Sequence, residues 1–156
     1  MSTLKRTTLI LAASLLVASG SAFAQQHFPE GAYRGSIVCE HLAGSTGILR
    51  APLDLVVSGT GVVAARPIFN RDGTRVVGSE IATGTVNGDG TLHLTSSWFA
   101  AGASFKGSYN GTLNAAGGTI NGVEAWIRSP ANGGNASRAC YGAYVRVPAA
   151  FAPSHE

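Results

Sequence analysis

The chain has 156 residues, of which 45% are hydrophobic and 12% charged, and it contains 21 glycines and two cysteines. Eleven Lys and Arg residues against eight Asp and Glu residues give a net charge of +3. This length predicts one domain, and the lack of basic runs or of interleaved basic and aromatic residues argues against nucleic-acid binding.

The N-terminal segment has the pattern of a secretory signal peptide. Lys5 and Arg6 form a positively charged region, "LILAASLLVA" follows as an apolar stretch, and Ala22-Phe23-Ala24 matches the small-x-small cleavage pattern. The apolar stretch is shorter than the roughly 20 residues of a membrane span, although a retained N-terminal anchor is an alternative. We expect cleavage after Ala24, a periplasmic or secreted protein with no stable membrane anchor, and a mature charge of only +1.

Residues 25–147 are predicted to form one all-β domain, followed by a disordered tail at 148–156. Turn signals rich in Asn, Asp and Gly ("SGTG", "NRDG", "NGDG", "NAAGG") separate short segments rich in Val, Ile, Thr, Tyr and Trp. The predicted strands are 32–40, 49–58, 62–69, 75–86, 91–99, 104–113, 119–127 and 139–147. The pairs Asn110-Gly111 and Asn121-Gly122 could instead be turns.

Cys39 and Cys140 are predicted to form a disulfide bond. A cysteine pair in an exported chain is more often a disulfide than a metal site or a catalytic thiol. The two cysteines fall in the first and last strands, which become neighbours when an antiparallel meander closes on itself. About eight strands, with large residues alternating with glycine along one face of "GSYNGTL" and "GGTINGVEAW", favour a small closed barrel. A β-sandwich is the alternative fold.

A few charged residues fall on otherwise apolar or small faces of these strands and are the candidate site residues. Arg66 and Glu80 lie across the "NRDG" turn and are predicted to pair. As a ligand site, the charges would anchor a polar group between aromatic walls. The alternative is a set of ion pairs that fills the core or reaches water at the strand ends. The candidate ligand-binding residues are Arg66, Glu80, Trp98, Tyr109, Glu124, Trp126 and Tyr144.

No pattern in the sequence predicts an enzyme, a cofactor or a metal. There is no Gly-x-Ser-x-Gly motif, and the histidines lack the spacing of a metal site. Gly59-x-Gly61-x-x-Ala64 resembles part of a dinucleotide fingerprint, but no helix is predicted to follow it. Paired carboxylates at Glu80 and Glu124 would be needed for glycosidase-like chemistry, and their separation cannot be read from the sequence.

The strand pattern resembles that of calycin-type barrels, the lipocalin and avidin group. "GAYRGSIVC", from Gly31 to Cys39, and the late Arg138-Ala139-Cys140 also resemble small exported bacterial proteins. The resemblance implies an eight-stranded barrel that binds a ligand. The chain lacks the Gly-x-Trp start of lipocalins, and Trp98 and Trp126 do not reproduce the biotin-binding tryptophans of avidins, so no ligand identity follows.

These patterns predict a non-enzymatic, exported binding module for a small apolar ligand or a protein partner. A second hypothesis is an envelope inhibitor or interaction protein with a solid barrel that acts through its loops, notably "HLAGSTG" and "RSPANGGNAS". A small outer-membrane barrel is a third. It would need an outward apolar band, whereas the strands carry Arg34, Asp54 and Lys106.

Overall fold

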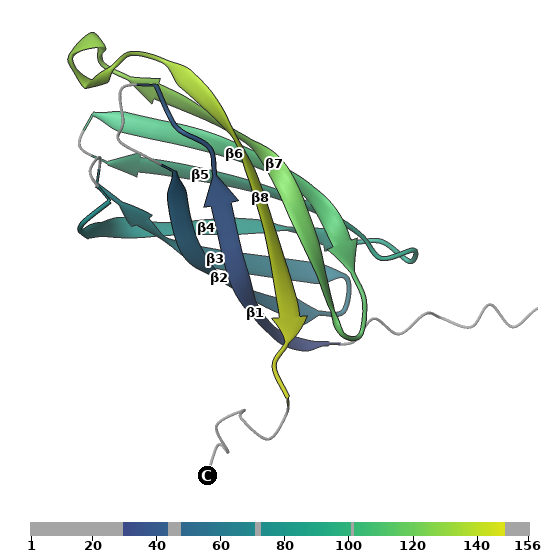
Figure 1. The fold of residues 1–156 in the computed structure, drawn as a ribbon. Coiled ribbons are helices and arrows are strands. Elements are labelled where there is room, and N and C mark those ends of the chain that lie inside the picture. The colour runs from purple at the N-terminus through teal and green to yellow at the C-terminus, as the bar shows by residue number, and fades with distance from the viewer. Residues whose placement is uncertain (1–29, 44–47, 71–72, 101, 149–156) are drawn as a thin grey trace, which may run out of the picture.

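A computed structural model describes residues 30–43, 48–70, 73–100 and 102–148, and these residues form an all-β domain. The predicted signal peptide, residues 1–24, lies outside the described residues, and so do residues 149–156 of the predicted tail. Eight strands follow one another along the chain, with one short 3-10 turn, η1, before the last of them (Figure 1). They are β1 (Gly31–Cys39), β2 (Leu49–Ser58), β3 (Gly61–Phe69), β4 (Val76–Val86), β5 (Thr91–Ala100), β6 (Ala103–Leu113), β7 (Gly117–Arg128) and β8 (Ala136–Arg146), with η1 at Pro130–Asn132.

The eight strands form an antiparallel meander that closes into a barrel. Each strand pairs with the next, and β8 pairs with β1. Cys39 lies directly opposite Cys140 in this last pair, and the two sulfurs are bonded. The predicted barrel and disulfide are therefore confirmed, and the alternative of a β-sandwich is wrong. Asn110 and Asn121 face each other within β6 and β7, so the alternative of turns at these positions is also wrong.

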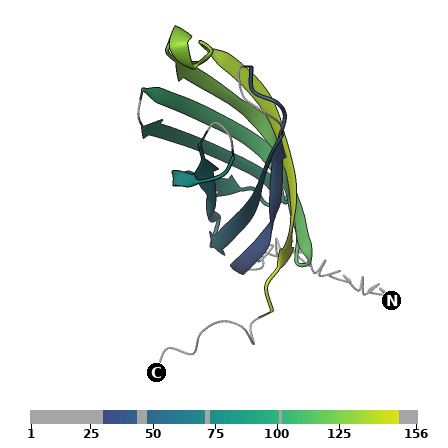
Figure 2. The ribbon, with the colours of Figure 1, turned by 60° about the vertical axis from the view of Figure 1, so that its left-hand side comes forward.

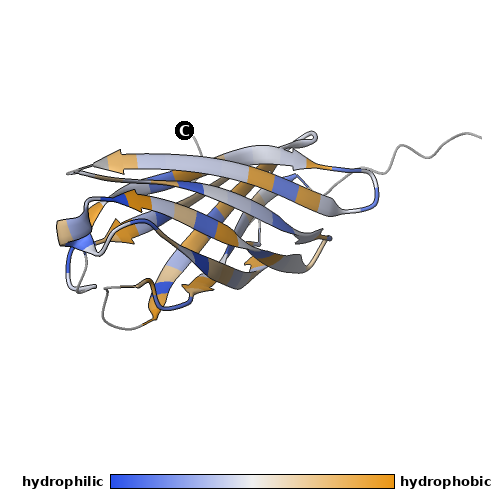
Figure 3. Ribbon diagram, turned by 90° about the horizontal axis from the view of Figure 1, so that it is seen from above, coloured by the Kyte–Doolittle hydropathy of each residue, from blue (hydrophilic) through white to orange (hydrophobic). Residues whose placement is uncertain are grey.

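Side chains along the strands alternate between the lumen and the outer surface, as a barrel wall requires. Hydrophobic and hydrophilic positions accordingly alternate along the ribbons in Figure 3. The lumen is filled by side chains from all eight strands, with large apolar members that include Tyr33, Ile37, Leu55, Leu92 and Leu94. Among the described residues, no helix is long and apolar enough to cross a membrane.

Glycines in β6 and β7 make room for an aromatic ring against the barrel wall. A Cβ atom on Gly122 would lie 2.5 Å from Cδ1 of Tyr109 and would overlap the carbonyl oxygen of Ser108. Gly107 is in a similar position, because a Cβ there would lie 2.6 Å from Cε2 of Tyr109. The alternation of glycine with large residues is thus a packing requirement of the lumen.

Gly122→Ala is expected to lower the free energy of unfolding by about 1–3 kcal/mol, because the added methyl group overpacks the Tyr109 site. Gly88→Ala is the matched control, since a Cβ atom on Gly88 has no neighbour within 4 Å. This control should change stability by no more than about 0.5 kcal/mol. Urea unfolding of both variants measures the difference. Equal stabilities would mean that the wall can relax around Gly122.

The barrel has two dissimilar ends. Strands β1, β3, β5 and β7 end at one end of the barrel, which we call the loop end, and β2, β4, β6 and β8 end at the opposite end (Figure 1). The first and last described residues, Glu30 and Pro148, adjoin strands at this opposite end. The β3–β4 hairpin separates from both neighbours toward the loop end (Figure 2). Its pairing with β2 stops at Asp54 and Ala65, and its pairing with β5 stops at Ala82 and Ser96.

Candidate functional site

Arg66 and Glu80 form an ion pair inside the barrel. They are direct cross-strand partners in β3 and β4, and both are buried. Arg66 Nε donates a hydrogen bond to Glu80 Oε2. The predicted pair is present because alternation points both side chains inward and the hairpin places them opposite each other.

Glu124 on β7 is the centre of the polar cluster and has no exposed surface. Its Oε1 accepts a hydrogen bond from Arg66 Nη2, which links β7 to β3 across the lumen. Its Oε2 accepts from Arg138 Nε at 2.7 Å and from Trp126 Nε1 at 2.9 Å. Arg138 lies directly opposite Glu124 in the β7–β8 pair.

The Glu80 carboxylate also has two neutral hydroxyl groups as hydrogen-bond donors. Tyr109 OH lies 2.8 Å from Glu80 Oε1 and 3.2 Å from Glu124 Oε1. Because a phenol has one proton, the shorter contact identifies Glu80 as its acceptor. Ser96 also donates to Glu80 Oε1. Burial, reinforced by the charges of Glu124 and Glu80, raises the pKa of Tyr109, so that it remains a donor.

The cluster is electrically balanced, with two guanidinium groups facing two carboxylates. Burial lowers the pKa of Arg66, but the charges of Glu124 and Glu80 outweigh it, so the net shift is upward. The side chains of Arg66, Glu80 and Glu124 are at most 3% exposed, and that of Arg138 is 9% exposed. Such a set persists in a core only because each charge has an opposite partner.

A small cavity lies beside the cluster. Its volume is about 10 Å³, and its lining includes Arg66, Glu80, Tyr109, Leu53, Leu94 and Ile120. That is close to the minimum needed for one water molecule. Arg66 Nη1 is a buried nitrogen with no hydrogen-bond partner among the described protein groups. A space of this size admits nothing larger than one water molecule.

Trp98, Phe105 and Trp126 form an aromatic layer between the polar cluster and the loop end. Ring centroids are 4.7 Å apart for Phe105 and Trp126 and 5.9 Å apart for the two tryptophans. Arg138 lies over the Trp126 ring, and Arg66 lies 5.9 Å from the Phe105 centroid. Both tryptophans are only partly buried. This layer therefore borders the surface of the barrel.

Tyr144, the remaining candidate, does not join the cluster. It lies toward the other end of the barrel, where its hydroxyl donates to the Thr112 carbonyl at 2.6 Å. Its ring packs edge-to-face against Tyr33, with centroids 6.0 Å apart. Six of the seven predicted site residues are thus brought together and Tyr144 is not, because sharing a luminal face does not fix the height along the barrel.

The burial of Tyr144 predicts a loss of stability at alkaline pH. Burial, with a contribution from Tyr33, raises the pKa of Tyr144 to about 12 from the ordinary value of 10.0. The unfolded chain then releases this proton at lower pH than the folded chain, so stability falls as pH rises between these values. Tyr144→Phe should show a shallower fall in urea-unfolding free energy between about pH 9 and pH 11. Parallel slopes for the two proteins would contradict this assignment.

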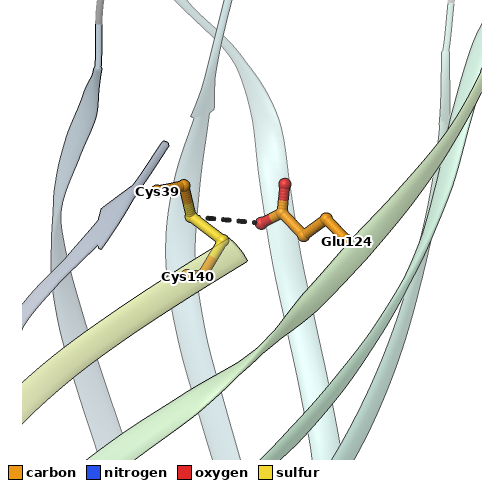
Figure 4. A group of neighbouring side chains, drawn as sticks. All are labelled: Cys39, Glu124 and Cys140. Atoms are coloured by element: carbon orange, nitrogen blue, oxygen red, sulfur yellow. Dashed lines mark hydrogen bonds between the residues drawn. A yellow bond between two sulfur atoms is a disulfide. The ribbon is translucent and has the colours of Figure 1, made fainter. Parts of the chain in front are cut away.

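Cys39, Cys140 and Glu124 place two sulfurs and a carboxylate close together (Figure 4). The sulfurs are joined in the disulfide, and Cys39 Sγ lies 3.5 Å from Glu124 Oε1. A disulfide sulfur carries no proton, so this is a packing contact. Metal binding by cysteine requires thiolates, and the Glu124 carboxylate already faces two guanidinium groups. The oxidised group therefore does not fit a cation.

Two members of the cluster were not predicted as site residues, Ser96 and Arg138. The sequence contains one indication for Arg138: it is two residues from Cys140, and this alternation places both on the inner face of β8. Its partner could not be read from the sequence, because the connection at 129–135 does not fix the β7–β8 register. No family model matches this chain, and neither a curated protein nor a solved structure is significantly similar to it.

Proposed function

We propose that this chain is a non-enzymatic, exported binding module that binds a protein partner at the loop end of a filled barrel. In this proposal the protein reaches the periplasm or the exterior after cleavage at Ala24. The calycin-type resemblance is retained for its architecture alone, since fold does not determine ligand.

The observation that carries the proposal is the small size of the cavity that the described residues leave beside the polar cluster. Pockets for small molecules usually have volumes of about 300–1,000 Å³. The cavity beside Arg66 and Glu80 has about 10 Å³. The side chains that the sequence predicts as a ligand site instead contact one another, as a salt-bridged cluster and a layer of close-packed aromatic rings. This favours a protein partner over a small apolar ligand in the lumen.

Five of the eleven large hydrophobic residues that are exposed in the described chain lie near the loop end, and they support this end as the binding surface. Phe99 is 79% exposed and Ile127 is 60% exposed, and both lie near the loop ends of their strands. Ile48, Val76 and Val77 are also exposed at this end. Grouped apolar side chains at a surface commonly mark protein interaction sites.

The state of the charged residues supports a function other than catalysis. Glu80 and Glu124 are each held by guanidinium and neutral donors, and both are buried. A general acid or base needs contact with a substrate proton. The wall of the barrel also carries exposed polar pairs such as Arg34 with Asp54, and His93 with Asn110. Such polar pairs argue against an outer-membrane barrel, whose outer surface carries an apolar band that faces the lipid.

Site-specific photo-crosslinking in intact cells tests the proposal. A photoreactive amino acid is placed at Phe99 or Ile127, and at Val145 as the matched control, which is 66% exposed near the opposite end. We expect a discrete protein adduct from the loop-end positions and none from Val145. Adducts from all three positions, or from none, would contradict a partner site at the loop end.

A further inference from the structure

Two strands diverge at the loop end and leave backbone edges open in the barrel wall. β4 and β5 pair from Val86 and Leu92 as far as Ala82 and Ser96. Beyond this point β4 still pairs with β3, and β5 still pairs with β6. The facing edges, Val76–Ile81 and Ser97–Ala100, have no backbone partner on this side among the described residues. We call these two edges the β4–β5 fork.

Exposed apolar side chains border the fork. Val76, Val77, Ile81 and Phe99 lie on its two edges and make up four of the eleven large hydrophobic residues that are exposed in the described chain. On the luminal side, Trp98 reaches toward Gly78, where a Cβ atom would lie 2.7 Å from the indole Nε1. The fork thus combines open main-chain groups with apolar surface on both faces.

Among the described residues near the fork, the exposed charged side chains are positive. Arg75 directly precedes β4, and Lys106 is the cross-strand neighbour of Ser97 on β6. Both are exposed, and neither forms an ion pair with another described residue. The nearest acidic residue of the fork, Glu80, is buried and neutralised by Arg66. The potential around the fork therefore favours an acidic partner.

We propose that the β4–β5 fork is a strand-addition site, which binds an extended segment of a partner protein that carries apolar and acidic side chains. This inference rests on the proposed function and names the mode by which the partner binds. Unpaired N–H and C=O groups in an extended row are satisfied best by another extended backbone. Apolar side chains on the inner face of that segment cover Trp98, and carboxylates on its outer face lie toward Arg75 and Lys106.

The same geometry distinguishes strand addition from other modes of binding. A helix satisfies its own main-chain groups and would leave the fork edges unpaired. An added strand also extends the sheet across the gap, so its contribution depends on its amide hydrogens as well as on its side chains. Removing those hydrogens without changing the side chains is therefore a direct test.

Three acetylated octapeptides serve as probes of the purified, disulfide-bonded protein. The first alternates valine and glutamate, the second carries the same side chains with N-methyl groups on alternate residues, and the third replaces glutamate with lysine. Binding is followed by tryptophan fluorescence, because Trp98 lines the fork. We expect saturable binding of the first peptide and at least about tenfold weaker binding of the other two.

Hydrogen exchange locates the bound peptide. Amides within Val76–Ile81 and Ser97–Ala100 should become protected when the valine–glutamate peptide is present. Phe99→Asp should weaken binding at least about tenfold, and Val145→Asp, which adds the same charge at the opposite end, should leave it unchanged. Circular dichroism establishes that both variants remain folded.

The inference is overturned if the valine–glutamate peptide shows no saturable binding by about 1 mM, if its N-methylated form binds equally well, or if protection appears elsewhere. Any of these results, together with discrete crosslinks from Phe99 and Ile127, would leave the loop-end partner site standing and reject strand addition. Missing crosslinks would instead reject the loop-end function itself.

Discussion

Glu124→Gln is expected to lower the free energy of unfolding by about 3–5 kcal/mol, the range for a buried ion pair that loses one partner. Glutamine has nearly the same shape but no charge. Arg66 would then keep Glu80 as its one carboxylate partner, and Arg138 would have no carboxylate partner among the described residues. The new amide group would also direct donor hydrogens toward one of the guanidinium donors. The penalty arises from the desolvated positive charge that stays behind.

Asp54→Asn is the matched control for this experiment. It also removes one negative charge from an ion pair, but the side chains of Arg34 and Asp54 are 74% and 56% exposed. Exposed pairs contribute about 0–1 kcal/mol, so this variant should remain close to the parent. Urea unfolding followed by circular dichroism gives both values.

The effect of salt separates the two variants further. The Glu124 effect should persist in about 1 M NaCl, because mobile ions screen buried pairs much less than exposed ones. A Glu124→Gln variant as stable as Asp54→Asn would mean that water reaches the cluster. The description of the lumen as filled would then fail.

Removing the disulfide is expected to be the second large perturbation. Replacing Cys39 and Cys140 by alanine opens a loop with a sequence separation of 101. Loop-closure entropy gives up to about 4.7 kcal/mol for a loop of this size, and removal of native disulfides usually costs about 2–5 kcal/mol. The hydrogen-bonded β1–β8 pair remains, so we expect a folded but less stable barrel.

Reduction of the native protein is the control, because it breaks the disulfide without replacing the cysteine side chains. Dithiothreitol should destabilise the parent by a similar amount, and it should have no effect on the double variant. Because both cysteines are fully buried, a strong denaturant is needed to expose the bond to the reductant. Equal stability of oxidised and reduced parent would show that the β1–β8 seam does not need the crosslink.

The fold could be predicted in detail because its signals are local. Turn motifs mark the strand ends, and alternation identifies the inner face of each strand. The "NRDG" turn also placed Arg66 near Glu80, since a short connection fixes the register of a hairpin. Cys39 and Cys140 identified the closing pair of strands without any knowledge of the other connections.

The rest of the site depends on features that local patterns do not record. Glu124 meets Arg66 across the lumen, and this contact depends on the tilt and stagger of all the strands. The fork depends on where β4 leaves β5, and the β3–β4 register also shifts between Ile68 and Phe69. Alternation predicts the face of a strand on which Tyr144 lies but not its height along the barrel, so the sequence does not separate Tyr144 from the cluster.

Native mass spectrometry of the mature protein, purified from the periplasm without denaturation, tests the central claim most directly. A filled barrel predicts the mass of the oxidised chain, alone or with a protein partner, and no small molecule. A small molecule that is bound in stoichiometric amount and released on denaturation would contradict the account, because it would place a ligand site in the barrel.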